Sequence, residues 1–208
     1  MERERITISI RKNLLDQIDK VIDGTNIRNR SHAFEKLSSL ALSLNGEKNA
    51  VILIGGKNAM KAVPAAQSFL KKLRENGFEK VYIATGFMVD KIKEKIGDGD
   101  DYNLTIEYFS DGEGTGGALL PFKKFFTSSF FVFNATEDFS FDLEKILEYH
   151  KKHHSIATTL FNNQDTMSGL YIFEPEVFKL IPKGFSMLEE NVFPKLVEKG
   201  ELVNHLAL

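Results

Sequence analysis

Cysteine is absent from the 208 residues, which excludes a disulfide framework, a thiolate nucleophile and a thiolate metal site. No apolar run approaches the roughly 20 residues that a membrane-spanning helix needs. The first ten residues, MERERITISI, are charged and then alternate between apolar and polar, unlike the continuous apolar core of a signal peptide. These absences predict a soluble, cytoplasmic protein with no membrane partner.

Neither sign of charge dominates the sequence. The net charge is −2, but residues 1–48 carry nine Lys and Arg against seven Asp and Glu, whereas the remainder carries 18 against 22. This bias is too small to identify a nucleic-acid binder by itself. The length and the hydrophobic content of 42% suit one medium domain, or a large domain with a small one attached, and allow a sizeable core.

Residues 5–44 predict a strand followed by two helices. The stretch RITISI alternates strictly, so its isoleucines share one face, and Arg5, Thr7 and Ser9 share the other. Asn13 and Ser31 are good N-cap residues, and each precedes apolar residues at helical spacing. The polar stretch NGEK, residues 45–48, then separates a first domain, 1–45, from a second domain, 49–208.

A strand and two helices of this size cannot close a core alone, and a lone strand leaves an unpaired edge. Two copies that pair their strands antiparallel would solve both problems. The order RITISIRKNLLDQID…NRSHAFEKL resembles the ribbon-helix-helix DNA-binding domain, whose ribbon enters the major groove. The resemblance implies a homodimer or higher homo-oligomer on double-stranded DNA.

Arginine can bond guanine O6 and N7 together, and serine and threonine hydroxyls can bond base edges. The DNA-binding residues that the resemblance implies are Arg5, Thr7, Ser9, Arg11, Arg30 and Ser31. The alternative is a dimerisation module whose polar strand face meets only solvent.

From Ala50 onward, short apolar runs alternate with amphipathic stretches. AVILIGG, KVYIATG, SSFFVFNA and SGLYIFE are typical of buried strands, and AAQSFLKKLRENG and FDLEKILEYHKKHH of helices. This alternation predicts an α/β domain with a largely parallel sheet that helices cover on both faces.

In this order the pieces resemble the sugar-phosphate nucleotidyltransferases over about residues 50–205. The resemblance rests on VILIGG, LRENGFEKVYIATGFMVDKIKEKIGDG, GEGTGGAL and SGLYIFEPEVFKLIPKGFSMLEENVFPKLVEKGEL. It implies a Rossmann-like (GT-A-like) fold with three layers, α/β/α. In that family a glycine loop after the first strand cradles the triphosphate, while an arginine and a lysine neutralise the departing pyrophosphate.

The first loop of this chain departs from the family pattern. Gly55 and Gly56 are kept, but KNAMKAVPA follows in place of the family's Gly-Thr-Arg, and the loop is several residues shorter. The resemblance implies that Lys61 stands for the family lysine, with Lys57 as the other candidate. A shortened loop without arginine is expected to activate a triphosphate poorly.

The family usually has Asn-Gly-Asp where this chain reads FVFNATEDF, and its aspartate holds magnesium. Asn134, Ala135 and Thr136 take those three places, so a hydroxyl replaces the carboxylate that this hard cation prefers. Glu137 and Asp138 lie next to them and are the alternative ligands. The family's second metal aspartate lies beyond GELVNHL, outside this sequence. We therefore expect no metal, no cofactor and no catalytic residue.

The stretch GEGTGGAL, residues 112–119, resembles the loop that contacts the nucleotide base in active relatives. Gly114 and Thr115 match its Gly-Thr pair, so a nucleotide or sugar nucleotide is the expected small-molecule ligand. One alternative is a turn that lets the helix at Gly117 approach the sheet. Another is a dinucleotide site, since the glycines also satisfy G-x-G-x-x-G.

His150, His153 and His154 share one helical face, a spacing that can ligate Zn²⁺. Lys151 and Lys152 beside them repel a cation, so the pattern predicts a solvated helix end.

Together these features predict a dimeric DNA-binding transcription regulator whose second domain is a catalytically degenerate sensor or assembly domain. The alternative is an active sugar-1-phosphate nucleotidyltransferase that uses Lys61 with Glu137 or Asp138 in an altered metal site. A third hypothesis is an architectural protein that coats DNA.

Overall fold

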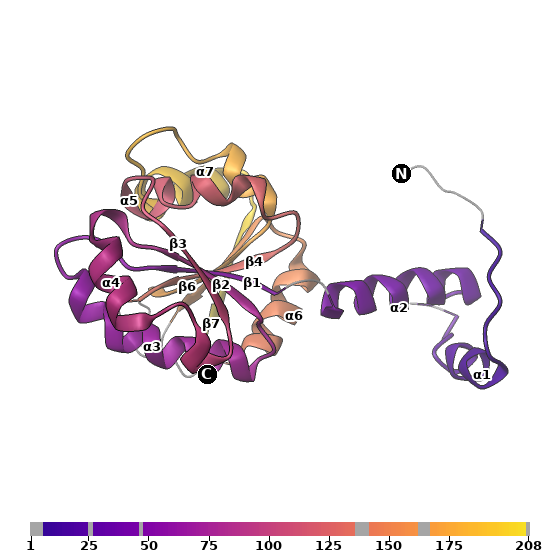
Figure 1. The fold of residues 1–208 in the computed structure, drawn as a ribbon. Coiled ribbons are helices and arrows are strands. Elements are labelled where there is room, and N and C mark those ends of the chain that lie inside the picture. The colour runs from indigo at the N-terminus through magenta and orange to yellow at the C-terminus, as the bar shows by residue number, and fades with distance from the viewer. Residues whose placement is uncertain (1–5, 25–26, 46–47, 136–141, 162–166, 207–208) are drawn as a thin grey trace. The chain divides into compact units, whose positions relative to one another are not determined.

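The chain folds as two units, Met1–Gly46 and Glu47–Leu208 (Figure 1). The computed structural model describes residues 6–24, 27–45, 48–135, 142–161 and 167–206. Within these ranges no helix is long and apolar enough to cross a membrane. The boundary between the units falls inside the polar stretch NGEK.

The first unit contains two helices, α1 (Lys12–Lys20) and α2 (Arg30–Asn45). Residues 6–11 precede α1 and belong to neither a helix nor a strand within the chain (Figure 1). The two predicted helices are therefore confirmed, but Asn13 lies inside α1 and does not cap it, so that part of the prediction is wrong. The pairing of the predicted strand with a second copy stays a prediction.

The second unit is built on a seven-stranded sheet with the order β3-β2-β1-β4-β6-β5-β7. The strands are β1 (Asn49–Leu53), β2 (Lys80–Ala84), β3 (Thr105–Phe109), β4 (Phe130–Asn134), β5 (Ala157–Phe161), β6 (Met167–Phe173) and β7 (Leu202–Leu206). Strands β1 to β4 are parallel, and so are β5 and β7. Strand β6 runs antiparallel to both β4 and β5.

The sheet is mixed, because β6 runs against the other six strands of the described sheet. The prediction of a largely parallel sheet is therefore confirmed for every strand but β6. A buried strand reads as the same apolar run in either direction, so SGLYIFE could not reveal that β6 is antiparallel. Strand β7 is an additional strand that the pattern did not predict. Its sequence, LVNHL, interrupts the apolar run with Asn204 and His205.

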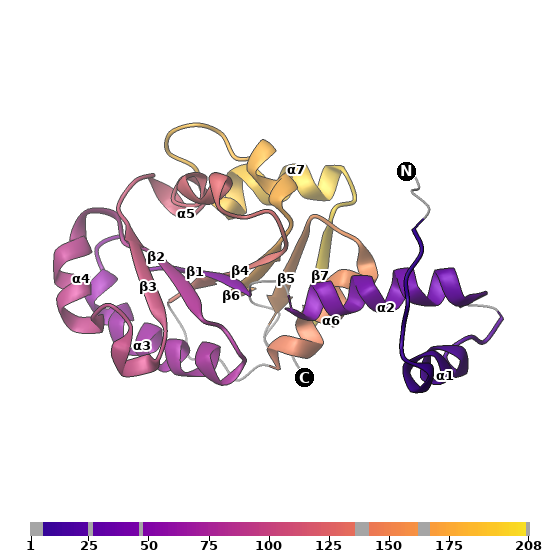
Figure 2. The ribbon, with the colours of Figure 1, turned by 45° about the vertical axis from the view of Figure 1, so that its right-hand side comes forward.

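Helices cover both faces of the sheet, as Figure 2 shows, and the α/β/α layering is confirmed. One face carries α3 (Ala59–Glu75), α4 (Val89–Ile96) and α6 (Leu143–His153). The other carries α5 (Gly114–Gly117), η3 (Leu120–Lys124), η4 (Pro175–Lys179), the π-helical turn η5 (Leu188–Val192) and α7 (Phe193–Glu198). The connections include η1 (Gly86–Met88) and η2 (Asp100–Tyr102).

Alternate residues of β1 face the two cores. Ala50 and Ile52 pack into the core under α3, and Val51 and Leu53 pack into the opposite core. This alternation follows from the pleat of a strand, and burial on both faces explains why β1 is apolar throughout.

Candidate functional site

Strands β1 to β4 are parallel, so the loops that follow them gather at one edge of the sheet. The chain moves outward from β1 to β2 and β3, then returns to the other side of β1 for β4. Open α/β sheets bind ligands at such a reversal of strand order. The loop after β1, with Gly55 and Gly56, and Asn134 at the end of β4 flank this point.

The loop after β1, residues 54–58, is called the first glycine loop here. Gly55 and Gly56 are exposed. Apart from the glycine itself and its two chain neighbours, no residue has an atom within 4 Å of where a side chain on either would begin. Gly56 has a φ of 74°, in the left-handed region that favours glycine. Helix α3 starts directly afterwards, and its amino end carries partial positive charge.

Two exposed lysines flank the same helix start, Lys57 in the loop and Lys61 in the first turn of α3. The structure therefore brings the predicted residues Gly55, Gly56 and Lys61 together, with Lys57 beside them. This surface suits a phosphate chain, because the exposed backbone of the loop, the dipole of α3 and two ammonium groups lie together there.

Residues 112–117, the second glycine loop, are packed rather than open. The N–H groups of Gly116 and Gly117 donate to the carbonyl oxygen of Ser186, at 2.8 and 3.1 Å. Gly114 has a φ of 75°, and a methyl group there would lie 2.3 Å from the same oxygen. These glycines allow the backbone of Ser186 to approach closely. The alternative, a turn that lets the helix at Gly117 approach the sheet, stays a prediction. A contact of Gly114 and Thr115 with a base stays a prediction.

A polar cluster that sequence reasoning missed is centred on Glu189. Its carboxylate accepts hydrogen bonds from the Thr115 hydroxyl at 3.2 Å and from the Tyr171 hydroxyl at 3.1 Å. The Thr115 oxygen in turn accepts from the N–H of Leu188 at 2.9 Å. Burial, with the charge of Glu189 beside it, raises the pKa of Tyr171, so its hydroxyl stays a donor. An exposed, oriented carboxylate therefore lies beside the second glycine loop.

Glu189 belongs to η5 and meets Thr115 only through the tertiary fold. Its neighbour Glu190 has the same side chain and is also exposed, so no local pattern separates the two.

At the end of β4, Asn134 is half-buried, and buried Ala135 donates its N–H to the carbonyl of Leu53 at 3.1 Å. Thr136, Glu137 and Asp138 lie outside the described residues. The described residues contain no group of three or more His, Cys, Asp or Glu that could hold a metal ion. We therefore assign no step to a resident metal, and its expected absence stays a prediction.

The predicted DNA contacts of the first unit differ in their surroundings. Arg5 lies outside the described residues, and Thr7, Ser9 and Arg11 are exposed. The guanidinium of Arg30 donates to both carboxylate oxygens of Asp19, at 2.7 and 2.6 Å. The hydrogen bond from Arg30 lowers the pKa of Asp19. This pair links the two helices of the unit.

Ser31 does not cap α2, and that prediction is wrong. The helix begins one residue earlier, at Arg30, and the side chain of Asn29 accepts a hydrogen bond from the N–H of His32 at 2.9 Å. Asn29 therefore takes the N-cap role, for which asparagine and serine are equally suited.

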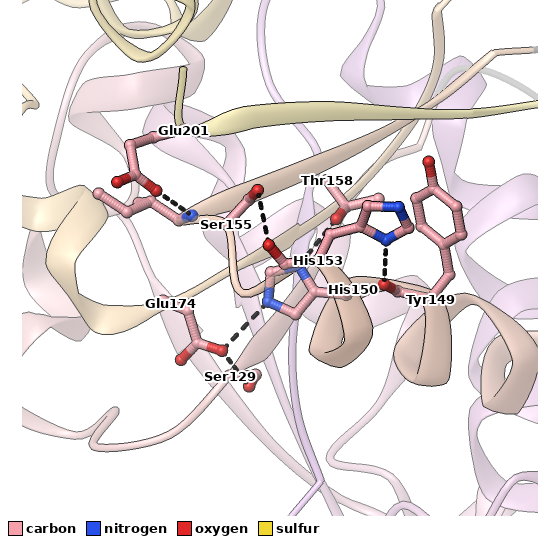
Figure 3. Close-up of polar contacts among 9 residues, drawn as sticks. Ser129, Tyr149, His150, His153, Ser155, Thr158, Glu174 and Glu201 are labelled. Carbon is pink, nitrogen blue, oxygen red and sulfur yellow. Dashed lines mark hydrogen bonds and ion pairs between the residues drawn. The ribbon is translucent and has the colours of Figure 1, made fainter. Parts of the chain in front are cut away.

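A buried polar cluster lies at the other edge of the sheet, before β4 and after β6 (Figure 3). His150 of α6 is 1% exposed, and its ring nitrogens lie 2.8 Å from the Thr158 hydroxyl and 3.1 Å from the Glu174 carboxylate. Ser129 donates to the same Glu174 oxygen at 2.7 Å. The prediction of a solvated helix end is therefore wrong for His150.

The signal for burial was present in the sequence, because His150 follows Leu143 and Ile146 on the apolar face of α6. His153 is exposed, and its Nδ1 instead lies 2.8 Å from the carbonyl of Tyr149 (Figure 3). The histidines therefore do not converge on one point.

A family profile described as "Nucleotidyl transferase" matches residues 41–168. The match includes both glycine loops and the end of β4.

Curated relatives carry related names. The chain is 25% identical over 186 residues to the UTP–glucose-1-phosphate uridylyltransferase of Synechocystis sp., covering 66% of this chain and 48% of the relative. It is 30% identical over 145 residues to the bifunctional protein GlmU of Methanococcus maripaludis, covering 69% of this chain and 30% of that relative. The chain is 21% identical over 170 residues to a mannose-1-phosphate guanylyltransferase catalytic subunit beta from Xenopus tropicalis, covering 64% of this chain and 47% of that relative. The chain thus spans about half or less of these relatives.

Solved structures share the fold. HddC from Yersinia pseudotuberculosis superposes with a TM-score of 0.63 at 17% identity, covering 76% of this chain and 90% of that one. A Bacillus anthracis protein reported as a glucose-1-phosphate thymidylyltransferase superposes with a TM-score of 0.64 at 16% identity, covering 77% and 87%.

These matches contradict the prediction of a DNA-binding transcription regulator with a catalytically degenerate second domain. The uridylyltransferase and guanylyltransferase relatives are named as enzymes that act on sugar 1-phosphates, and the profile match begins at residue 41, after most of the first unit. They favour the alternative, an active nucleotidyltransferase. The relatives named above support neither DNA binding nor loss of catalysis.

Proposed function

The chain belongs to the nucleotidyl transferase family, and from this premise we propose that its second unit transfers a nucleotidyl group from a nucleoside triphosphate to a sugar 1-phosphate. The names of the uridylyltransferase and guanylyltransferase relatives support this reaction class.

In this reaction an oxygen of the sugar phosphate bonds to the α-phosphorus of the triphosphate. The bond from the α-phosphorus to the oxygen that bridges the β-phosphate breaks, and pyrophosphate leaves with that electron pair. Negative charge grows on the leaving group, so catalysis needs cations and N–H donors fixed at that position. In this chain Lys57, Lys61 and the amino end of α3 supply them in place of the family's arginine.

The observation that carries the proposal is the open space at Gly55 and Gly56. The second glycine loop is filled by the backbone of Ser186, whereas the first leaves room for phosphates beside two exposed lysines. We place the sugar hydroxyls at Glu189, because an oriented carboxylate accepts hydrogen bonds from them.

Replacing Lys61 with methionine should lower kcat/KM for pyrophosphate release by about 100-fold, the scale for removing one group that stabilises transition-state charge. The full chain is assayed with magnesium salts of the common nucleoside triphosphates against a panel of sugar 1-phosphates. Lys71→Met is the matched control, since Lys71 is exposed on the same helix and far along it from the loop.

The control should keep wild-type activity. Absence of pyrophosphate release with every pair, or equal losses in both lysine variants, would contradict the proposal.

We also propose that two copies pair through a ribbon-helix-helix arrangement of the first unit. Ile6 and Ile8 are 73% and 51% exposed, and only Ile18 and Ala33 are buried hydrophobic residues in the described part of this unit. Residues 6–10 also have no strand partner within the described chain. Pairing of two such segments would cover the isoleucines and satisfy their backbone groups.

This pairing predicts a solution mass of twice 23.5 kDa by light scattering. Ile8→Lys should shift the protein to the single-chain mass, because it places a charge in the shared apolar face. Thr7→Lys, on the opposite face of the same segment, should leave the mass unchanged. A wild-type protein of single-chain mass would refute the pairing.

A further inference from the structure

A cavity of about 600 Å³ opens beside β3, an edge strand of the sheet. Its lining residues are Phe109, Asp111, Leu120, Pro121, Lys123 and Lys124. They belong to the two segments that enter and leave the second glycine loop. We propose that this cavity binds a small phosphorylated ligand with an apolar ring, and that the bound ligand holds the second glycine loop in its docked position.

The apolar wall of the cavity is already ordered. The ring of Phe109 lies 4.8 Å from that of Phe122, centroid to centroid, and 6.1 Å from that of Tyr82. Phe122 is fully buried and fixes η3, which contributes Leu120 and Pro121 to the lining. A preformed wall needs little ordering on binding, which favours a ring lying against it.

The rim supplies the charge. Lys123 and Lys124 are exposed, and neither forms an ion pair in the described part of the chain; the Lys124 ammonium lies 4.8 Å from the Phe125 ring centroid. Two ammonium groups against the single carboxylate of Asp111 favour an anion, and lysine is a common phosphate ligand. Asp111 can accept hydrogen bonds from hydroxyls of the same ligand.

The position of the cavity connects it to the loop. A methyl group on Gly112 would lie 2.3 Å from the carbonyl oxygen of Gly117, so the two stems of the loop touch. Asp111 precedes this contact along the chain, and Lys123 and Lys124 follow it in η3. A ligand that contacts both stems of the loop holds them together. It favours the docked state because it makes both contacts only when the loop is docked.

Binding of the ligand in the cavity does not depend on the proposed function. An effect of the ligand on turnover does depend on the proposed function. Binding is therefore measured first, in the full chain with Lys61→Met added to weaken the first glycine loop. The probes are nucleoside monophosphates, sugar phosphates, inorganic phosphate and an unphosphorylated nucleoside, each titrated by calorimetry. This panel separates a base, a sugar and phosphate alone as the recognised group.

We expect a ring-bearing phosphate to bind, and Lys123→Glu with Lys124→Glu to weaken it at least tenfold. Lys91→Glu with Lys95→Glu is the charge-matched control, because both lysines are exposed on α4, on the opposite face of the sheet. The control should bind as the parent does. Equal affinity in both double variants, or binding of inorganic phosphate alone, would overturn the site.

Amide hydrogen exchange tests the effect on the loop. The N–H groups of Gly116 and Gly117, which donate to Ser186, should exchange more slowly when the ring-bearing phosphate is bound. The charge-matched control should show the same slowing, and the Lys123→Glu, Lys124→Glu variant should not. Unchanged exchange at saturating ligand would overturn the link between cavity and loop.

Discussion

Replacing Gly114 with alanine should destabilise the second unit by about 3 kcal/mol, the sum of backbone strain and two lost hydrogen bonds. At a φ of 75° an alanine is strained by about 1–2 kcal/mol. Its methyl group would also lie 2.3 Å from the carbonyl oxygen of Ser186, and a backbone atom cannot rotate away. Separation of the two segments would break the hydrogen bonds of Gly116 and Gly117, at about 1 kcal/mol each.

Gly184→Ala is the matched control for this prediction. Gly184 has a φ of 86°, but no atom lies within 4 Å of where its side chain would begin. It should therefore show only the backbone strain, about 1–2 kcal/mol. Urea unfolding is followed by tyrosine fluorescence, because all five tyrosines lie in the second unit. Equal destabilisation by both variants would mean that close approach at Gly114 is unimportant.

Much of the second unit follows from local pattern. Strands β1, β2 and β4 were predicted because each is a short apolar run that the sheet buries on both faces. The direction of β6 and the existence of β7 could not be predicted in the same way. Direction depends on the connection between strands, and β7 is recruited by its pairing with β5 rather than by its own composition.

The candidate site also contains residues that sequence spacing groups and residues that only the fold brings together. Gly55, Gly56 and Lys61 lie within one loop and one helical turn, so sequence spacing was enough to group them. Glu189 and Tyr171 reach Thr115 from two other elements, and only the folded chain brings them together.

The wrong functional prediction has a physical origin. It took the missing arginine, the shortened first glycine loop and the missing metal aspartates together as a missing function, although Lys57 and Lys61 place two ammonium groups beside the same backbone. Charge at a phosphate site is a sum over the loop, the helix end and nearby side chains. Departures from a motif therefore say less about activity than the positive charge that remains at the phosphate site does.

His150→Ala should destabilise the second unit by about 2 kcal/mol, which is the scale for leaving a buried polar group without its hydrogen-bond partner. The change leaves the fully buried Thr158 hydroxyl and the Glu174 carboxylate without the ring that joins them. Lys152→Ala, exposed on the same helix, is the control and should change stability by less than about 0.5 kcal/mol. Similar urea midpoints for both variants would refute a structural role for this cluster (Figure 3).

The same cluster predicts a pH dependence. Burial raises the pKa of Glu174, but hydrogen bonds from His150 and Ser129 outweigh burial and hold this pKa below its ordinary value of 4.5. A pKa that folding lowers contributes stability that is fully present above the unfolded-state value and is lost as the pH falls through the folded-state value. Wild-type protein should therefore lose stability in urea as the pH falls below 4.5, and Glu174→Gln should lose less over the same range. Parallel stability curves for the two proteins would show that Glu174 titrates as it does in the unfolded chain.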